Sequence, residues 1–234
     1  MRQQTLFIVL LFFVSAMANC QVSMNEKFEK SWNTSDTIEK RMLREDIAVK
    51  SPDSEYGLFC RAWFLTLKSD NVAALEMYSK AIELKSDFWQ AYNNRGILYA
   101  GLADYDKAVT DYTKTIELNP VFADAYINRG ILYQNLKDYT KAISDYNKAI
   151  SINPNDAETY YNRGITYLYS GDLSGSISDF NKAIEINPAF GGAYYNRGGA
   201  YYSTGNKTKA CEDWNLAYKF GIMDAKEALN RFCK

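Results

Sequence analysis

The segment AYINRGILYQNLKDYTKAISDYNKAISINP, residues 125–154, contains a pattern that recurs along the chain. Its first phrase, AYINRGILY, returns as AYNNRGILY at 91–99, YYNRGITY at 160–167 and YYNRGGAY at 194–201. The arginines of these phrases are 34 residues apart. A fixed period of this length predicts an array of similar structural units, each of which packs on its neighbours.

Each unit is expected to be a pair of helices. In residues 121–154, Tyr126, Gly130 and Tyr133 fall at helical spacing, and a second apolar run follows Asp138. Asp138 marks the turn between the helices, and Pro154 ends the unit because proline cannot continue a helix. A glycine in mid-helix is costly, so Gly130 predicts close contact with a neighbouring helix.

The same comparison divides the whole chain. Residues 53–86 form a degenerate unit that keeps Arg61 but has Ala62 in place of the glycine. Before it, a helix from about Asp36 is expected, either as a cap of the array or as a decayed half-repeat. The predicted segments are a signal peptide at 1–18, an N-terminal segment with the capping helix at 19–52, units at 53–86, 87–120, 121–154, 155–188 and 189–222, and a C-terminal capping helix at 223–234.

The units resemble tetratricopeptide repeats over residues 53–222. The family signature corresponds here to Tyr126, Arg129-Gly130, Tyr133, Ala142, Tyr146, Ala149 and Pro154. The resemblance implies an all-α fold, a right-handed superhelical α-solenoid of about five repeats. It also implies that the first helices line a concave groove that binds a peptide or protein segment.

The resemblance assigns the groove-facing positions residue by residue. No Lys or Arg occupies them, so a clamp for a carboxylate is not expected, and the apolar and aromatic lining suits a segment with apolar anchors. The alternative is that residues 21–50 cover part of this face, or that it only packs helices together. The predicted groove residues are Asn93, Ile97, Ile127, Asn128, Ile131, Tyr161, Asn162, Ile165, Leu168, Tyr195 and Tyr202.

The repeated arginine stands where the family usually has leucine, and an aspartate follows it by sixteen residues in four units. We expect each pair to form an ion pair inside its hairpin, which would make a ladder along the array. The alternative is that the arginine stems pack while their charged ends reach solvent. The expected pairs are Arg95 with Asp111, Arg129 with Asp145, Arg163 with Asp179, and Arg197 with Asp213.

The first twenty residues have the layout of a secretory signal: one arginine, an apolar core from Leu6 to Val14, and then small residues. Cleavage after Ala18 would leave Asn19 first. Alternatively, Cys20 would be acylated as in a bacterial lipoprotein, although Asn19 departs from that signal. Both interpretations place the mature protein outside the cytoplasm, in the periplasm, outside the cell or on a membrane through the lipid.

Export permits disulfides, and Cys211 with Cys233 is the favoured pair. Helices over about 207–220 and 224–232, with a pivot near Gly221, would bring the two residues opposite each other. The alternative is two unlinked thiols. Cys20 could pair with Cys60 only if Cys20 is not acylated.

The composition favours binding over catalysis. The chain has no histidine, and 27 Lys and Arg balance 28 Asp and Glu, which gives no reason to expect a nucleic-acid partner. No metal-ligand spacing or glycine-rich loop is present, so we expect no enzyme activity, cofactor or metal. The predicted function is a protein interaction module of the bacterial envelope. The alternatives are self-assembly through the apolar stripe of 224–232, or a binder of small ligands.

Overall fold

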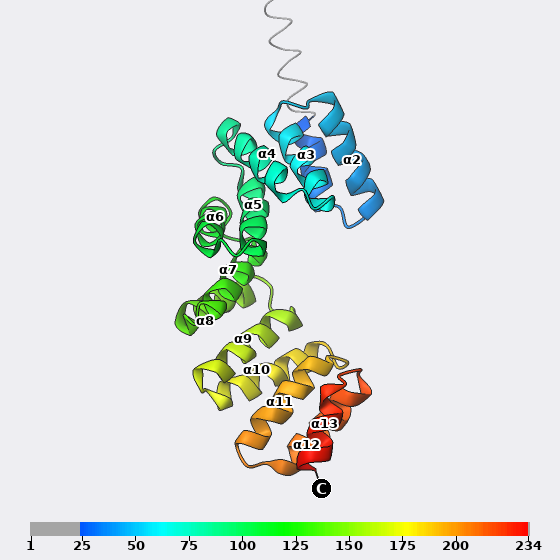
Figure 1. Ribbon diagram of the computed structural model, residues 1–234, viewed down its shortest axis with the longest axis vertical. Helices are drawn as coiled ribbons and strands as arrows, with labels where there is room; N and C mark the ends of the chain where they lie inside the picture. Colours follow the sequence, from blue (N-terminus) through cyan, green and yellow to red (C-terminus); the bar gives the residue numbers. More distant parts are fainter. Residues whose placement is uncertain (1–23, 234) are drawn as a thin grey trace, which may run out of the picture. The chain divides into compact units, whose positions relative to one another are not determined.

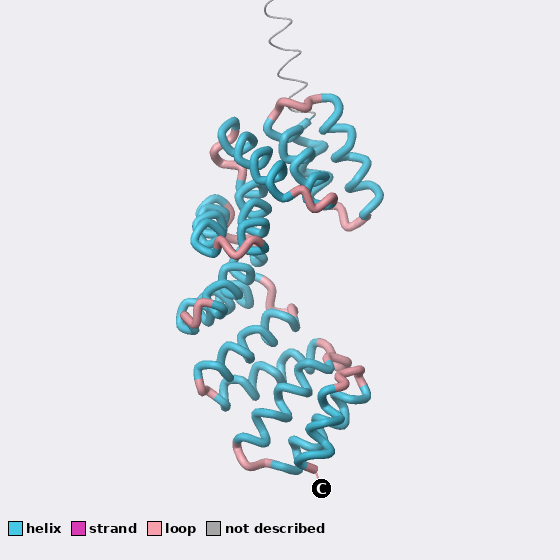
Figure 2. Tube along the Cα trace, in the orientation of Figure 1, coloured by secondary structure: helices cyan, strands magenta, loops and turns pink. Residues whose placement is uncertain are grey.

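The computed structural model describes residues 24–233, and throughout this range the secondary structure is helical, with turns between the helices (Figures 1 and 2). The chain forms two compact units that divide between Leu98 and Tyr99. In the second unit, consecutive helices form antiparallel pairs, and each pair packs on the next. The expected all-α fold, an α-solenoid of helical hairpins, is confirmed.

The first unit begins with a helix over residues 24–33. It continues with α2 (Thr37–Lys50), α3 (Glu55–Leu67), α4 (Asn71–Leu84) and the larger part of α5 (Trp89–Gly101). The second unit contains α6 (Tyr105–Leu118), α7 (Ala123–Asn135), α8 (Tyr139–Ile152), α9 (Ala157–Ser170), α10 (Leu173–Ile186), α11 (Gly191–Ser203), α12 (Lys207–Lys219) and α13 (Asp224–Phe232).

The second helix of each hairpin begins at an N-cap. Asp138 accepts a hydrogen bond from the backbone N–H of Lys141 at 3.2 Å, which satisfies a donor that the helix leaves free. The same contact recurs at Asp70, Asp104, Asp172 and Asn206. The turn positions recognised in the sequence therefore act by capping.

The residue just before each cap has a left-handed backbone. Gly171 and Gly205 occupy this position in the later hairpins, with φ of 88° and 84°. Ser69, Ala103 and Lys137 occupy it in the earlier hairpins, with φ between 60° and 62°. A residue with a Cβ atom loses about 1–2 kcal/mol in this conformation, whereas glycine does not. The earlier turns are therefore strained.

We predict that Lys137→Gly stabilises the protein by about 1 kcal/mol, because it relieves this strain at an exposed position. Thermal unfolding should show a midpoint higher by about 2–4 °C. Leu136→Gly is the matched control, because Leu136 has an ordinary φ of −77° and a glycine there relieves nothing. An equal gain from both substitutions would contradict the assignment.

The mid-helix glycines lie against large side chains of the partner helix. A Cβ atom at Gly130 would lie 3.0 Å from the ring of Tyr146, and one at Gly164 would lie 2.8 Å from the ring of Phe180. Both distances are shorter than ordinary van der Waals contact. The close helix contact predicted from these glycines is confirmed.

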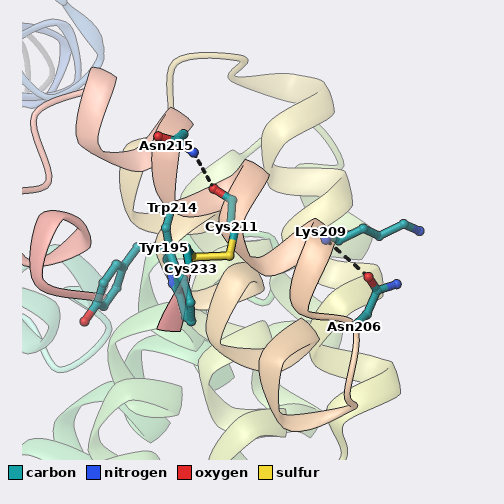
Figure 3. Close-up of a disulfide and its surroundings, with 7 residues drawn as sticks. All are labelled: Tyr195, Asn206, Lys209, Cys211, Trp214, Asn215 and Cys233. Atoms are coloured by element: carbon teal, nitrogen blue, oxygen red, sulfur yellow. Dashed lines mark hydrogen bonds between the residues drawn. A yellow bond between two sulfur atoms is a disulfide. The ribbon is translucent and has the colours of Figure 1, made fainter. Parts of the chain in front are cut away.

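At the C-terminal end, α13 packs on α12, and the disulfide between Cys211 and Cys233 joins the two helices (Figures 1 and 3). The Cα atoms of the two cysteines are 5.8 Å apart. Ala225 and Ala228 of α13 are buried, and the ring of Phe232 lies 4.6 Å from that of Tyr202. The stripe that suggested self-assembly is therefore packed inside this chain.

We predict that Cys211→Ser with Cys233→Ser destabilises the C-terminal hairpin by roughly 3 kcal/mol, the value expected for closing a loop of this length. Hydrogen exchange should become faster in α13 first, because only the disulfide and one packed face hold it. Cys60→Ser is the control for thiol loss, since Cys60 is a free thiol far from this loop in sequence. Unchanged exchange in α13 would refute the prediction.

The third described cysteine, Cys60, is buried in the first unit. Burial raises the pKa of its thiol to about 12, because the thiolate would lose its hydration. This thiol is therefore protonated at neutral pH and is a core residue.

The signal-peptide and Cys20 acylation predictions lie outside the described residues. Within residues 24–233, none of the helices has both the length and the apolar character needed to cross a membrane.

Candidate interaction surface

One side of the first helices α7 and α9 carries most of the predicted groove residues. Ile127 and Asn128 stand four and three residues before Ile131, so both neighbour it on the surface of α7. The equivalent residues of α9 follow 34 positions later. The helices α7 and α9 also touch each other. We call this surface the α7/α9 face, and it comprises Ile127, Asn128, Ile131, Tyr161, Asn162, Ile165 and Leu168.

The residues of the α7/α9 face are all partly accessible to solvent. Ile131 is 36% exposed, so about a third of its apolar side chain is open to solvent. Ile165 and Leu168 are half-buried and pack at their inner edges against the core around Phe180. The face is therefore an apolar surface supported by the core beneath it.

Tyr161 has a fixed orientation on this face. Its ring lies 4.7 Å from the ring of Phe190, and its hydroxyl accepts a hydrogen bond from the side-chain amide of Asn196 at 3.0 Å. Burial and the charge of Glu158 raise the pKa of the Tyr161 phenol. Tyr161 therefore contributes both to packing and to the accessible surface.

Tyr195 and Tyr202 contact the C-terminal helix. Tyr202 packs on Phe232 of α13 and on Trp214, with ring centres 4.6 and 5.8 Å apart. Tyr195 borders a hollow of about 250 Å³ that is otherwise lined by α13 residues. Because α13 partly covers this end, Tyr202 holds the cap in place and is not part of an open groove.

In the first unit, the chain's own N-terminal helix covers the equivalent positions. Phe28 lies 5.0 Å from Phe59, ring centre to ring centre, and Trp32 lies 5.2 Å from Trp89. Phe59 is completely buried, and Asn93 is only 4% exposed. The expectation that Asn93 lines an accessible groove is therefore corrected, because it is enclosed among packed side chains. Ile97, at 46% exposure, remains accessible.

Helix α2 covers the next position along α3. The guanidinium carbon of Arg44 lies 4.5 Å from the ring centre of Trp63 and 5.6 Å from that of Phe59. Arg44 is 3% exposed, and this burial lowers its pKa. The alternative that the N-terminal segment covers part of the first-helix face therefore describes α3 correctly.

The repeated arginines make paired hydrogen bonds within their hairpins. The Nε and Nη2 atoms of Arg129 donate to Asp145 at 2.9 and 2.8 Å. Arg163 with Asp179 and Arg197 with Asp213 have the same arrangement, at 2.7–2.8 Å. The aspartate side chains are only 5–8% exposed. This geometry is that of a bidentate, largely buried ion pair.

Each arginine also reaches back to the preceding hairpin, a contact that the sequence analysis missed. The Nη1 atom of Arg129 donates to the hydroxyl of Thr113 at 2.9 Å, and that of Arg197 donates to the amide oxygen of Asn181 at 2.6 Å. Arg163 makes the same contact with Asn147. The acceptor always stands sixteen residues before the arginine, but its residue type changes. Each guanidinium thus joins three helices.

The remaining arginines of the series have different surroundings. Arg61 has Met77 at the aspartate position, and its side chain is 44% exposed. Its contacts are a 3.9 Å ion pair to Asp53 and a 3.4 Å hydrogen bond to the carbonyl of Pro52. Arg95 donates to the hydroxyl of Ser79 at 3.0 Å, which repeats the backward contact. Asp111 belongs to the second unit, and the ion pair between Arg95 and Asp111 stays a prediction.

Tyrosines on the same helix lie over the repeated arginines. The guanidinium carbon of Arg163 lies 5.6 Å from the ring centre of Tyr160 and 5.9 Å from that of Tyr167. The hydrogen bonds with Asp179 raise the pKa of Arg163, so the group carries its charge at any accessible pH. The arginines that form these ion pairs, Arg129, Arg163 and Arg197, are therefore structural.

We predict that Arg129→Ala destabilises the protein by about 2–3 kcal/mol at neutral pH, since it leaves Asp145 buried without its partner. This change in stability is smaller than the full cost of leaving a buried charge unpaired, because the Arg129 side chain is partly exposed and solvent weakens the ion pair. Arg61→Ala, which breaks no bidentate pair, should change stability by less than about 0.5 kcal/mol. An unchanged unfolding midpoint for Arg129→Ala would count against the ladder.

The described residues contain no cluster of three or more Cys, Asp or Glu side chains that could hold a metal ion. What they present is a stack of helical hairpins, held by internal ion pairs, with an apolar face on α7 and α9. This arrangement defines a helical repeat protein of the α-solenoid class.

The sequence model of the tetratricopeptide repeat family matches residues 89–122, 123–156 and 157–190. Residues 89–190 are therefore tetratricopeptide repeats, in a frame that starts two residues later than the units defined from the sequence. No curated protein sequence matches the chain significantly.

Solved structures of tetratricopeptide repeat proteins share the fold. A crystal structure of MamA is 25% identical, with a TM-score of 0.66 over 70% of this chain and 96% of MamA. A MamA fragment from Desulfovibrio magneticus RS-1 is 21% identical, with a TM-score of 0.65 over 68% of this chain and 90% of the fragment. YrrB, described as a repeat protein with an unusual peptide-binding site, is 24% identical, with a TM-score of 0.68 over 80% of this chain and 97% of YrrB. These similarities show that the chain shares the helical repeat fold of these proteins.

Proposed function

We propose that the protein is a non-enzymatic interaction module that binds a segment of a partner protein on its α7/α9 face. The observation that carries the proposal is the exposure of Ile131 beside Ile165 on adjacent first helices. Apolar side chains on neighbouring helices supply a surface whose burial favours association. The peptide-binding site named for YrrB, a protein of the same fold, is consistent with this role.

The extent of the proposed binding surface is set by the helices that cover the first-helix positions near each end of the chain. The N-terminal helix already fills the equivalent surface on α3, where Phe59 is fully buried. The C-terminal helix α13 engages Tyr202. The proposed binding surface is therefore centred on α7 and α9.

We also propose that the protein acts outside the cytoplasm, in the bacterial envelope. The apolar run at Leu6 to Val14 and the pairing of Cys211 with Cys233 support export, because such bonds persist in oxidising compartments. Mass spectrometry of the mature N-terminus distinguishes cleavage before Asn19 from acylation at Cys20.

The experiment that tests the binding surface is crosslinking in the native host. A photoreactive residue at position 131 should give a defined adduct, because it lies on the proposed surface. One at position 121, where Val121 is 71% exposed but outside the face, is the control. Adding Ile165→Ser should remove most of the adduct at position 131. Identical adducts from both positions would rule the surface out.

A further inference from the structure

Three carboxylates border the α7/α9 face at the N-terminal ends of its helices. Asp124 lies in the first turn of α7, Glu158 lies in the first turn of α9, and Asp156 is the N-cap of α9. Asp124 and Glu158 are exposed and stand 34 residues apart. Each precedes an apolar face residue by seven positions, Ile131 and Ile165 respectively, so it lies on the same side of its helix.

These carboxylates lack the cations found beside comparable acids elsewhere. The N-cap residues Asp104 and Asp138, which start second helices, pair with Lys107 and Lys141 at 2.6 and 2.7 Å. Among the described residues, Asp124, Asp156 and Glu158 form no ion pair within 4.0 Å. Asp156 instead caps its own helix through the backbone N–H of Glu158.

Burial and mutual repulsion both act on the carboxylates of this border. Loss of hydration first, and the charge of Asp156 second, raise the pKa of both Asp124 and Glu158. Glu158 stands three residues before Tyr161 on α9, so the carboxylate lies beside the aromatic surface, and its charge adds to the rise in the pKa of Tyr161. A cation held at this border would relieve the repulsion among the three groups.

The first unit contains an internal example of a basic side chain on this kind of surface. Arg44 of α2 lies over Trp63 and Phe59 of the first helix α3. Trp63 is two repeat periods before Ile131, and Phe59 is three periods before Tyr161. The corresponding positions of α3 thus already hold a guanidinium against apolar and aromatic groups.

We propose that the α7/α9 face selects a partner segment in which a lysine or arginine adjoins apolar side chains. The apolar residues lie on Ile131 and Ile165, and the basic residue lies among Asp124, Asp156 and Glu158. Opposite charge across a partly desolvated border contributes mainly to selectivity and to the rate of association. This inference rests on the proposed function, because it assigns the chemistry of the segment bound at the same surface.

Two synthetic peptides test the charge preference directly. Both have 18 residues, a fluorescent label, and leucines spaced as on one face of a helix; one carries lysines at the flanking positions and the other carries glutamates. Fluorescence anisotropy with the full chain should show binding of the lysine peptide about tenfold tighter than that of the glutamate peptide. The difference should shrink as NaCl rises from about 50 to 300 mM, because salt screens exposed charges.

Asp124→Asn with Glu158→Gln should weaken binding of the lysine peptide about five- to tenfold while keeping the shapes of both side chains. The matched control is Asp106→Asn, which removes an exposed acid from the first turn of a second helix, α6. This control should leave binding within about twofold, since it removes a negative charge near a helix N-terminus without changing the face. Equal binding of the two peptides, or an equal loss in the control, would overturn the inference.

A further variant separates this inference from the proposed function. If Ile131→Ser with Ile165→Ser abolishes binding of both peptides while the charge variant has no effect, the face binds segments without selecting basic ones. The inference then fails and the proposed function stands. If neither variant alters peptide binding, and crosslinks at position 131 match those at 121, both fail.

Discussion

The second unit depends on the way each repeated arginine joins three helices. The guanidinium extends from a first helix, pairs with an aspartate of the second helix, and donates once more to the preceding hairpin. Because Arg has five donors in a planar fork, one side chain can make all three contacts. The interaction therefore sets the angle inside a hairpin and the spacing between hairpins together. The apolar face on α7 and α9 has a defined geometry for this reason.

The sequence predicted the parts of the structure that repeat. The spacing of sixteen residues between Arg129 and Asp145 recurs in register, so the pairing within a hairpin could be inferred without coordinates. The backward contact was missed because its acceptors, Ser79, Thr113, Asn147 and Asn181, can all accept a hydrogen bond but are not all of one residue type. A search for polar side chains at a fixed offset would have found it.

The parts that do not repeat were harder to predict. The helix over 24–33 has no counterpart along the chain, so no periodic comparison shows that Phe28 and Trp32 insert among the aromatic residues of α3 and α5. Residues of the same repeat position therefore differ in role. Phe59 is core, Tyr161 is partly accessible, and Asn93 is enclosed, because each helix has a different neighbour over it.

The sequence separation between each repeated arginine and its hydrogen-bond partners has a consequence for how such an array could change in length. The contacts of Arg163 extend sixteen residues forward to Asp179 and sixteen back to Asn147, less than one period in either direction. A duplication of one complete period within residues 87–222 would therefore recreate every donor and acceptor at the new junctions. The non-repeating helices at the two termini would stay in place, and the array would grow from the middle in whole steps of one hairpin.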